Sequence, residues 1–258
     1  MSNFDPDWWR KIFDDVYLIT DARSIGNAQV NRVEVNLVED LLCPGVNDRI
    51  LDLCGGQGRH AIELAKRGYK NVVVADYSYS LLAVGVEEAK KQGVSLDFVR
   101  CDARSLCMEE SRFDHVIIMG NSFGYFRDDR DNRAILSEVS RILKNGGRII
   151  VDLVSRRYIV NNFVPSSWHE AGNDTVVCRS RTLETDGLLV REMVLSKERG
   201  LVRDITYFTR LFYRDELYRL FSSEGFKDIS FIDEFKPHGS DGDYGMLTNR
   251  VIVSAIAG

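Results

Sequence analysis

Short apolar runs alternate with longer amphipathic segments between residues 46 and 154. The runs are rich in valine, isoleucine and leucine and lie at 49–54, 71–76, 96–101, 115–120 and 148–153. Near-continuous apolar runs of this length are typical of parallel strands that are covered on both faces. The segments between them that end in glycine, as helices often do, are 59–68, 79–93 and 128–147. The alternation predicts an α/β fold with a Rossmann-like, doubly wound and mostly parallel sheet.

The pattern changes after residue 154. Three strand-like runs are joined by the turn-forming sequences TDG and KERG and lie at 174–184, 187–196 and 200–213. They predict a small antiparallel β-meander inserted into the fold. The pattern that follows predicts one helix and two strands, at 213–226, 228–233 and 250–256, which would complete a seven-stranded sheet.

The first 45 residues predict helices. A first helix would begin with Asp5 as its N-cap and Pro6 at its first position, and would continue to about residue 19. A second amphipathic pattern covers residues 31–42, after a polar stretch, and ends before Pro44.

The composition is that of an ordinary globular domain, with 258 residues, 44% apolar and 28% charged. A net charge of −5 argues against the broad basic surface with which proteins bind nucleic acid. The five cysteines show neither a CxxC pair nor a matching histidine spacing, so we expect no metal site and no disulfide framework. The first residues do not resemble a signal peptide, and no run approaches 18 apolar residues, so we expect no membrane partner and a cytoplasmic location.

A glycine-rich loop follows the first apolar run. The sequence LDLCGGQGRHA (51–61) contains Gly56-x-Gly58-x-x-Ala61, a loose dinucleotide fingerprint that would suit a nicotinamide-dependent oxidoreductase. Asp52, however, precedes the glycines, and its carboxylate would repel a pyrophosphate and attract an ammonium group. The loop therefore favours S-adenosylmethionine, which carries an ammonium group, a carboxylate and an adenosine. A simple turn-capping role for Asp52 stays open.

Further acids end the next two strands. Asp76 lies 18 residues after Gly58 (76 − 58) and would accept hydrogen bonds from the ribose hydroxyls, unless it only caps the next helix. Asp102 would accept from the adenine amino group, and the Ala103 amide would face the ring. Tyr77 and Leu81 would flank the adenine, although core packing explains both side chains equally well.

These residues resemble the class I S-adenosylmethionine-dependent methyltransferases, and more narrowly their bacterial small-molecule branch. The segments that carry the resemblance are DLCGGQGRHA, NSFGYF (121–126) and RILKNGGRIIVDL (141–153). The resemblance implies that Asp52, Gly56, Gly58, Asp76, Asp102 and Ala103 line the cofactor site, and that the carbonyl of Met119 faces the cofactor's amino group. Cys54 replaces the usual first glycine, which is tolerable if that position avoids positive φ.

The methyl acceptor is less well defined. Asn121, Tyr125 and the phenylalanines of NSFGYF lie where they could orient an acceptor and exclude water. His169 is the first candidate for a general base and His238 the second, while an amine acceptor would need none. Tyr17 is the expected contact from the N-terminal helices. The arginines of the meander would bind an acidic group of the acceptor or form a solvated or dimer-forming face.

The sequence thus predicts a methyltransferase that acts on an oxygen or nitrogen atom of a small molecule. The alternatives are an RNA- or protein-directed methyltransferase, the oxidoreductase mentioned above, and a binding module without activity. The expected organisation is an N-terminal helical lid (1–45), a cofactor-binding core (46–154 and 213–258) and an antiparallel insertion that covers the substrate (155–212). A homodimer would form through the meander.

Overall fold

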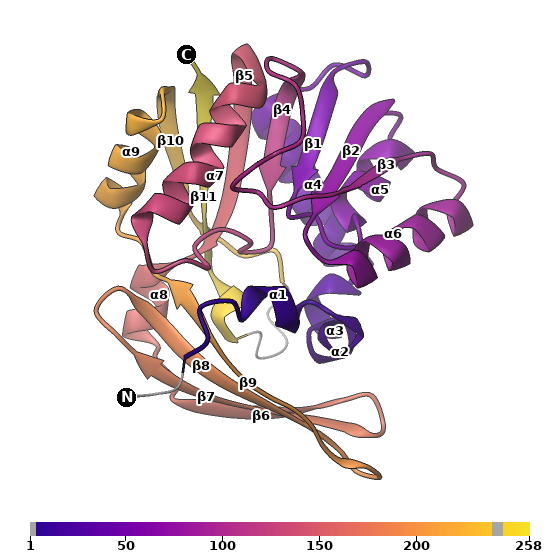
Figure 1. Cartoon of the computed structure of the whole chain (residues 1–258), viewed down its shortest axis with the longest axis vertical. Helices are drawn as coiled ribbons and strands as arrows, with labels where there is room; N and C mark the ends of the chain where they lie inside the picture. Colours follow the sequence, from indigo (N-terminus) through magenta and orange to yellow (C-terminus); the bar gives the residue numbers. More distant parts are fainter. Residues whose placement is uncertain (1–3, 239–244) are drawn as a thin grey trace.

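The computed structural model describes residues 4–238 and 245–258. Its central sheet is built from β1 (Arg49–Leu53), β2 (Asn71–Asp76), β3 (Asp97–Arg100), β4 (Phe113–Ile118), β5 (Leu143–Val154), β10 (Phe226–Phe235) and β11 (Arg250–Ala257). The strand order is β10-β11-β5-β4-β1-β2-β3 (Figure 1). Strands β1 to β5 pair in parallel, whereas β11 runs antiparallel to both of its neighbours. The predicted Rossmann-like, mostly parallel seven-stranded sheet is confirmed.

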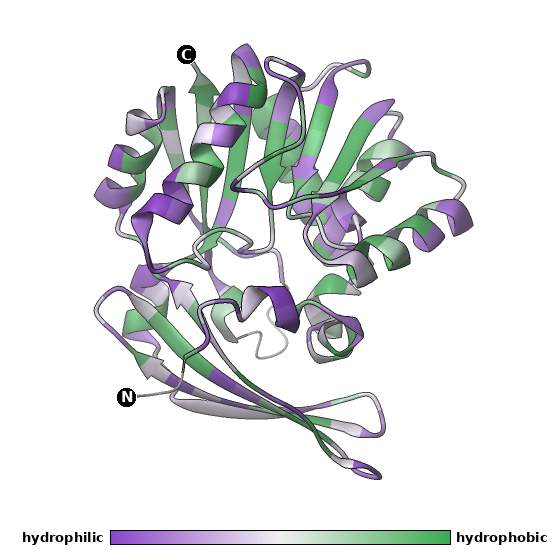
Figure 2. Cartoon of the chain, in the orientation of Figure 1, coloured by the Kyte–Doolittle hydropathy of each residue, from purple (hydrophilic) through white to green (hydrophobic). Residues whose placement is uncertain are grey.

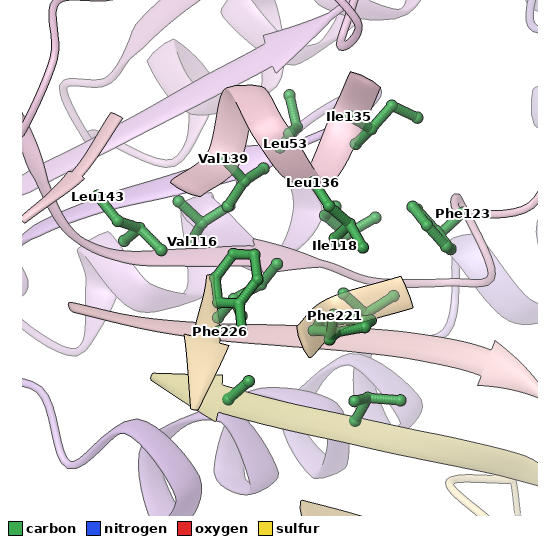
Figure 3. Packing of buried hydrophobic residues seen from close by; sticks show 14 of the residues in the cluster. Leu53, Val116, Ile118, Phe123, Ile135, Leu136, Val139, Leu143, Phe221 and Phe226 are labelled. Atoms are coloured by element: carbon green, nitrogen blue, oxygen red, sulfur yellow. The ribbon is translucent and has the colours of Figure 1, made fainter. Parts of the chain in front are cut away.

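Helices cover both faces of this sheet. They are α4 (Ala28–Leu42), α5 (Arg59–Lys66), α6 (Tyr79–Lys91), α7 (Asp129–Ile142) and α9 (Arg214–Ser223). Alternate residues of each strand enter different clusters: Leu51 and Leu53 pack with α7 and α9, while Ile50 packs with α4 and α5. Figure 2 shows the central strands as mostly hydrophobic, as expected for strands buried on both faces. Figure 3 shows Leu136 and Val139 of α7 and Phe221 of α9 beside the strands.

Gly85 shows how closely α6 approaches the glycine loop. A Cβ atom at this position would lie 2.5 Å from the Phe98 ring and 2.7 Å from the carbonyl oxygen of Gln57. We therefore expect Gly85→Ala to destabilise the protein by about 1–3 kcal/mol through overpacking, although alanine gains about 1 kcal/mol in helix propensity. Thermal unfolding shows whether the variant is less stable than the wild type. Val84→Ala on the exposed side of the same helix is the control, and a Gly85 variant more stable than the wild type would contradict the prediction.

A second sheet has four antiparallel strands in the order β6-β7-β8-β9. They are β6 (Ser166–Ala171), β7 (Thr175–Leu183), β8 (Gly187–Ser196) and β9 (Gly200–Arg210), and α8 (Arg156–Asn161) precedes them. The prediction of a meander is confirmed for β7 to β9, but the prediction did not include β6 and α8. Within the part of the chain that the structure describes, strand β6 pairs only with β7, at the edge of the sheet, so it needs little apolar content and gives a weak sequence signal.

The N-terminal region differs from the prediction. The single helix expected from Asp5 is wrong: residues 5–8 form a turn, in which Trp8 N donates to Asp5 O at 3.1 Å, and the helical chain breaks near Asp14. Asp14 caps the second helix by accepting from the amides of Val16 and Tyr17. The resulting short helices are α1 (Trp9–Ile12), α2 (Asp15–Thr20) and α3 (Ala22–Ile25).

Two further boundaries were not predicted. Helix α4 begins at Ala28, because Asn27 caps it by accepting from the amides of Gln29 and Val30. A short 3₁₀ helix, η1 (Gly245–Thr248), precedes β11. Figure 1 shows α1 to α3 between the two sheets. No helix in the described part of the chain is both long and apolar enough to cross a bilayer.

Candidate functional site

A cleft opens where β1, β2 and β4 end. It is lined by nearly all of the side chains and backbone that the sequence assigned to the cofactor, namely Tyr17, Asp52, Cys54, Gly56, Asp76, Tyr77, Leu81, Asp102, Ala103 and Met119. Gly58 lies outside this lining. It precedes α5, and a Cβ there would lie 3.0 Å from Val74 and 3.1 Å from Phe98, so the glycine allows the loop to pack on the sheet.

The glycine loop turns immediately after β1. Gly56 has φ 57° and Gly58 has φ 70°, which glycine adopts without strain. Cys54 also has φ 57°, so the expectation that it avoids positive φ is wrong. The left-handed conformation costs a non-glycine residue about 1–2 kcal/mol, and the neighbouring Gly55 amide holds the turn by donating to Ala75 O at 3.2 Å.

Asp52 is fully buried beneath the loop. Its Oδ2 atom accepts from the Ala61 amide at 3.3 Å, while Oδ1 has no hydrogen-bond partner among the described residues. Burial raises the pKa of Asp52 to about 7. An unpaired buried carboxylate oxygen at the cleft fits a cationic donor such as an ammonium group.

The pH dependence of stability tests this environment. Because the folded-state pKa of Asp52 is about 7 and its ordinary value is 3.8, the folded protein holds a proton between these values that the unfolded chain has lost. The free energy of unfolding therefore falls as the pH rises from about 4 to 7. In the absence of ligand, we compare the free energy of unfolding of Asp52→Asn with that of the wild type. We expect this difference to be about 2–4 kcal/mol more favourable to the variant at pH 8 than at pH 4. Denaturant unfolding of both proteins at both pH values measures this difference. A difference in stability that is the same at pH 4 and pH 8 would contradict the prediction.

Asp76 connects the glycine loop to the next turn. Its two carboxylate oxygens accept from the amides of Gly56 and Ser78, each at 2.8 Å. Burial raises its pKa, against the effect of these hydrogen bonds. The cap of α6 is Ser78, whose hydroxyl accepts from Leu81 N at 3.2 Å, so Asp76 does not have the capping role left open by the sequence.

Asp102 has a partner that the sequence did not indicate. The Arg104 side chain donates to both carboxylate oxygens, at 3.0 and 2.7 Å. Burial raises the pKa of Asp102, but the hydrogen bonds from Arg104 outweigh it and hold the pKa below its usual range. Arg104 also lies over the rings of Trp9 and Phe126, at 5.1 and 4.6 Å from the centroids. The guanidinium therefore joins this end of the cleft to α1.

A buried network of charges contributes several residues to the lining of the cleft. Arg250 donates to both Glu34 and Asp152, and Glu34 also accepts from Arg59. His60 Nε2 lies 2.9 Å from Glu34, and burial lowers the His60 pKa to about 4, so the ring is neutral at pH 7. The sequence did not indicate Glu34, Asp152 and Arg250 as members of this network. No local pattern could reveal them, because Glu34 and Arg250 are 216 residues apart.

A second cavity adjoins the first, between α1, α2 and the four-stranded sheet. The two share several lining residues, which are Phe13, Tyr17, Asp21, Gly120, Tyr125 and Leu247. The second cavity also brings together the three catalytic candidates Asn121, Tyr125 and His169. His238, the alternative base, lines the first cavity instead.

The environments of these candidates limit their chemistry. The Asn121 side-chain oxygen accepts from the Val154 amide at 3.0 Å, which fixes its orientation. His169 Nε2 lies 3.1 Å from the carbonyl oxygen of Thr20, so this nitrogen carries a proton and cannot act as the base. Burial raises the pKa of Tyr125 well above 10, so its hydroxyl remains protonated.

The arginines of the meander have different positions. Arg179 and Arg181 line the second cavity, and Arg179 is shared by Asp21 and Glu192 at 3.1 and 2.7 Å. Arg203 pairs with Asp14. Arg191 pairs with Asp204 on the exposed side of the sheet. The buried Glu192 was not among the sequence candidates.

Comparisons with known proteins point to methyltransferases. Residues 50–147 match a family model described as a methyltransferase domain. The chain is 30% identical over 200 residues to a glycine/sarcosine N-methyltransferase of Halorhodospira halochloris, an alignment that covers 76% of this chain and 71% of that protein. It is 36% identical over 144 residues to a demethylmenaquinone methyltransferase of Clavibacter sepedonicus, which covers 54% and 55% of the two.

The fold is also found among solved structures. The CcbJ methyltransferase from Streptomyces caelestis matches with a TM-score of 0.74 at 17% sequence identity. The match covers 98% of this chain and 99% of that one, so it includes the four-stranded sheet as well as the core.

Proposed function

The chain belongs to the class I S-adenosylmethionine-dependent methyltransferases, and from this premise we propose that it methylates an oxygen or nitrogen atom of a small molecule. S-adenosylmethionine is the cofactor, and it supplies a methyl group activated by the positive charge on its sulfur. Membership of this family excludes the alternative of a nicotinamide-dependent oxidoreductase. It leaves the acceptor to be inferred from the site.

The cofactor would occupy the cleft beside the glycine loop. Asp52 Oδ1, which has no partner among the described residues, would accept from the ammonium group. Asp76 would accept from the ribose hydroxyls with the lone pairs that its two amide donors leave free. Asp102 and the Ala103 amide would face the adenine, between Tyr77 and Leu81. The carbonyl of Met119, which also accepts from the Ser122 hydroxyl, would face the cofactor's amino group.

The acceptor would occupy the second cavity. The observation that carries this proposal is that the two cavities meet at Tyr17, Gly120 and Tyr125, so a ligand in each would face the other there. Residues 1–45 would act as a lid and residues 155–212 as a cover. In support, Trp8 packs on Tyr207 of β9, while Trp9 packs on Tyr77 beside the glycine loop.

A small acceptor suits this arrangement better than a nucleic acid or a protein. The place where the cavities meet is bordered by close aromatic rings, with Phe13 5.1 Å from Tyr17 and 5.4 Å from Tyr125. Rings this close narrow the place of transfer and leave little room for a polymer. Tyr125 and Asn121 would orient the acceptor, and His169 would contact it through its imidazole ring. A homodimer formed through the four-stranded sheet stays a prediction.

Two measurements test the proposal. Calorimetry should detect binding of S-adenosylhomocysteine, the demethylated cofactor, and a protein that is folded but does not bind it would contradict the cofactor site. Incubation of a small-molecule panel with isotopically labelled S-adenosylmethionine should give a labelled product of low mass. Label found only on added RNA or protein would contradict the small-molecule acceptor.

A further inference from the structure

The second cavity holds a buried carboxylate oxygen without a hydrogen bond. Glu192 is 2% exposed and lines the cavity from β8. Its Oε2 accepts from Arg179 Nε at 2.7 Å, but Oε1 has no hydrogen-bond partner among the described residues. Arg203 Nη1 lies 3.7 Å from Oε1, which is beyond hydrogen-bond distance. A buried acceptor of this kind is expected to be satisfied by a ligand or by water.

The same cavity also holds a buried donor without a partner. Trp8 is 1% exposed, and its indole Nε1 has no hydrogen-bond partner among the described residues. Trp8 comes from the N-terminal region and Glu192 from the four-stranded sheet, and Tyr207, with its ring 5.4 Å from Trp8, also lines the cavity. A ligand that satisfies both residues must donate one hydrogen bond and accept another.

The unpaired carboxylate oxygen of Glu192 and the aromatic faces of the cavity suit a cationic donor. Arg179 is shared by Asp21 and Glu192, and Arg203 lies between Asp14 and Glu192. This group of three carboxylates and two guanidinium groups has one surplus negative charge, which the guanidinium of Arg181 in the same cavity balances. Arg181 also lines the cavity, where it donates to Ser167 Oγ at 2.9 Å on a neighbouring strand. Aromatic faces such as those of Trp8, Tyr125 and Tyr207 add cation–π attraction for an ammonium group.

We propose that the acceptor is a small amine that also carries an oxygen atom, and that its nitrogen is methylated. Glu192 Oε1 accepts a hydrogen bond from the amino group, and Trp8 Nε1 donates one to the oxygen. This inference rests on the proposed small-molecule function and narrows it. Bound as an ammonium ion, the amine first loses one proton to water. Its lone pair then forms the nitrogen–carbon bond, and the electron pair of the broken carbon–sulfur bond stays on sulfur.

The first experiment compares amines with alcohols of matched shape. The probes are ethanolamine with ethylene glycol, alanine with lactate, and glucosamine with glucose, each incubated with ¹³C-methyl S-adenosylmethionine. Mass spectrometry should find label on at least one amine and none on its matched alcohol. Label on the alcohols to the same extent would overturn the inference but leave the small-molecule function intact. No product from these probes or from a bacterial metabolite extract, with S-adenosylhomocysteine still bound, would contradict both.

The second experiment changes the two side chains. Glu192→Gln keeps the shape and removes the charge, and it should raise the KM of the methylated amine about 10- to 100-fold. The affinity for S-adenosylhomocysteine should stay within about twofold of the wild type, because Glu192 does not line the cofactor cleft. Asp204→Asn, the same chemical change at a partly exposed carboxylate of the neighbouring strand β9, is the matched control and should have no effect.

Trp8→Phe separates recognition from folding. It keeps an aromatic ring against Tyr125 and Tyr207 but removes the indole N–H. We expect the KM of the methylated oxygen-bearing amine to rise about 5- to 10-fold, while the binding of ethylamine, which has no oxygen, stays unchanged. Unchanged KM values in both variants would overturn the assignment of Glu192 and Trp8.

Discussion

Replacing Arg250 with methionine is expected to destabilise the protein by about 3–5 kcal/mol, because it leaves buried carboxylates without their cation. Arg250 is 1% exposed and donates to Glu34 of α4 and Asp152 of β5. Asp152 is fully buried, and burial already raises its pKa to about 6 despite the adjacent guanidinium. Chemical denaturation of the ligand-free protein at pH 8 measures the loss.

The pH dependence of this loss and a second substitution show whether the uncompensated buried charge causes the destabilisation. Without Arg250, the pKa of Asp152 should rise further, so the loss of stability should be larger at pH 8 than at pH 5. Adding Asp152→Asn to Arg250→Met removes one of the uncompensated charges and should restore part of the stability. A loss below about 1 kcal/mol, or an equal loss at both pH values, would show that the network contributes little beyond packing.

The central sheet could be predicted from the sequence because each strand has an unbroken apolar signal. The runs at 49–54 and 71–76 correspond to β1 and β2 within one residue. Strand β5 begins earlier than predicted, at Leu143, because its Gly146–Gly147 segment still continues the strand. Strand β6 and helices α3 and α8 have only four to six residues each, and their places depend on neighbours far away in the chain. Local patterns do not contain that information.

The grouping of the cofactor candidates around one cleft was predictable for the same reason that the strands were. Each candidate acid lies within two residues of the carboxyl end of a strand, and the carboxyl ends of parallel strands meet at one edge of the sheet. The partners of these acids were not predictable, since Arg104 reaches Asp102 through a turn and Arg250 reaches Glu34 across 216 residues. Glu192 was missed because the alternating pattern of its strand shows only on which face of the sheet it lies. Its burial depends on α1 and α2, which cover that face.

Removal of the Asp76 carboxylate is expected to weaken the binding of S-adenosylhomocysteine about 100-fold. The change Asp76→Ala removes the acceptor of the Gly56 and Ser78 amides, which hold the loop closed. It also removes the proposed acceptor of the ribose hydroxyls. Hydrogen bonds to a charged group contribute about 1.5–3 kcal/mol each, and a factor of 100 corresponds to about 2.8 kcal/mol. Calorimetric titration of the folded variant measures the change.

The pH dependence of binding distinguishes the carboxylate from a purely structural effect. Because burial raises the pKa of Asp76, binding to the wild type should weaken as the pH falls through that pKa, whereas the alanine variant should lack this dependence. Asp97→Ala, at an exposed position where β3 begins, removes the same charge far from the cleft and should bind normally. A dissociation constant within about threefold of the wild type for folded Asp76→Ala would show that another group holds the ribose.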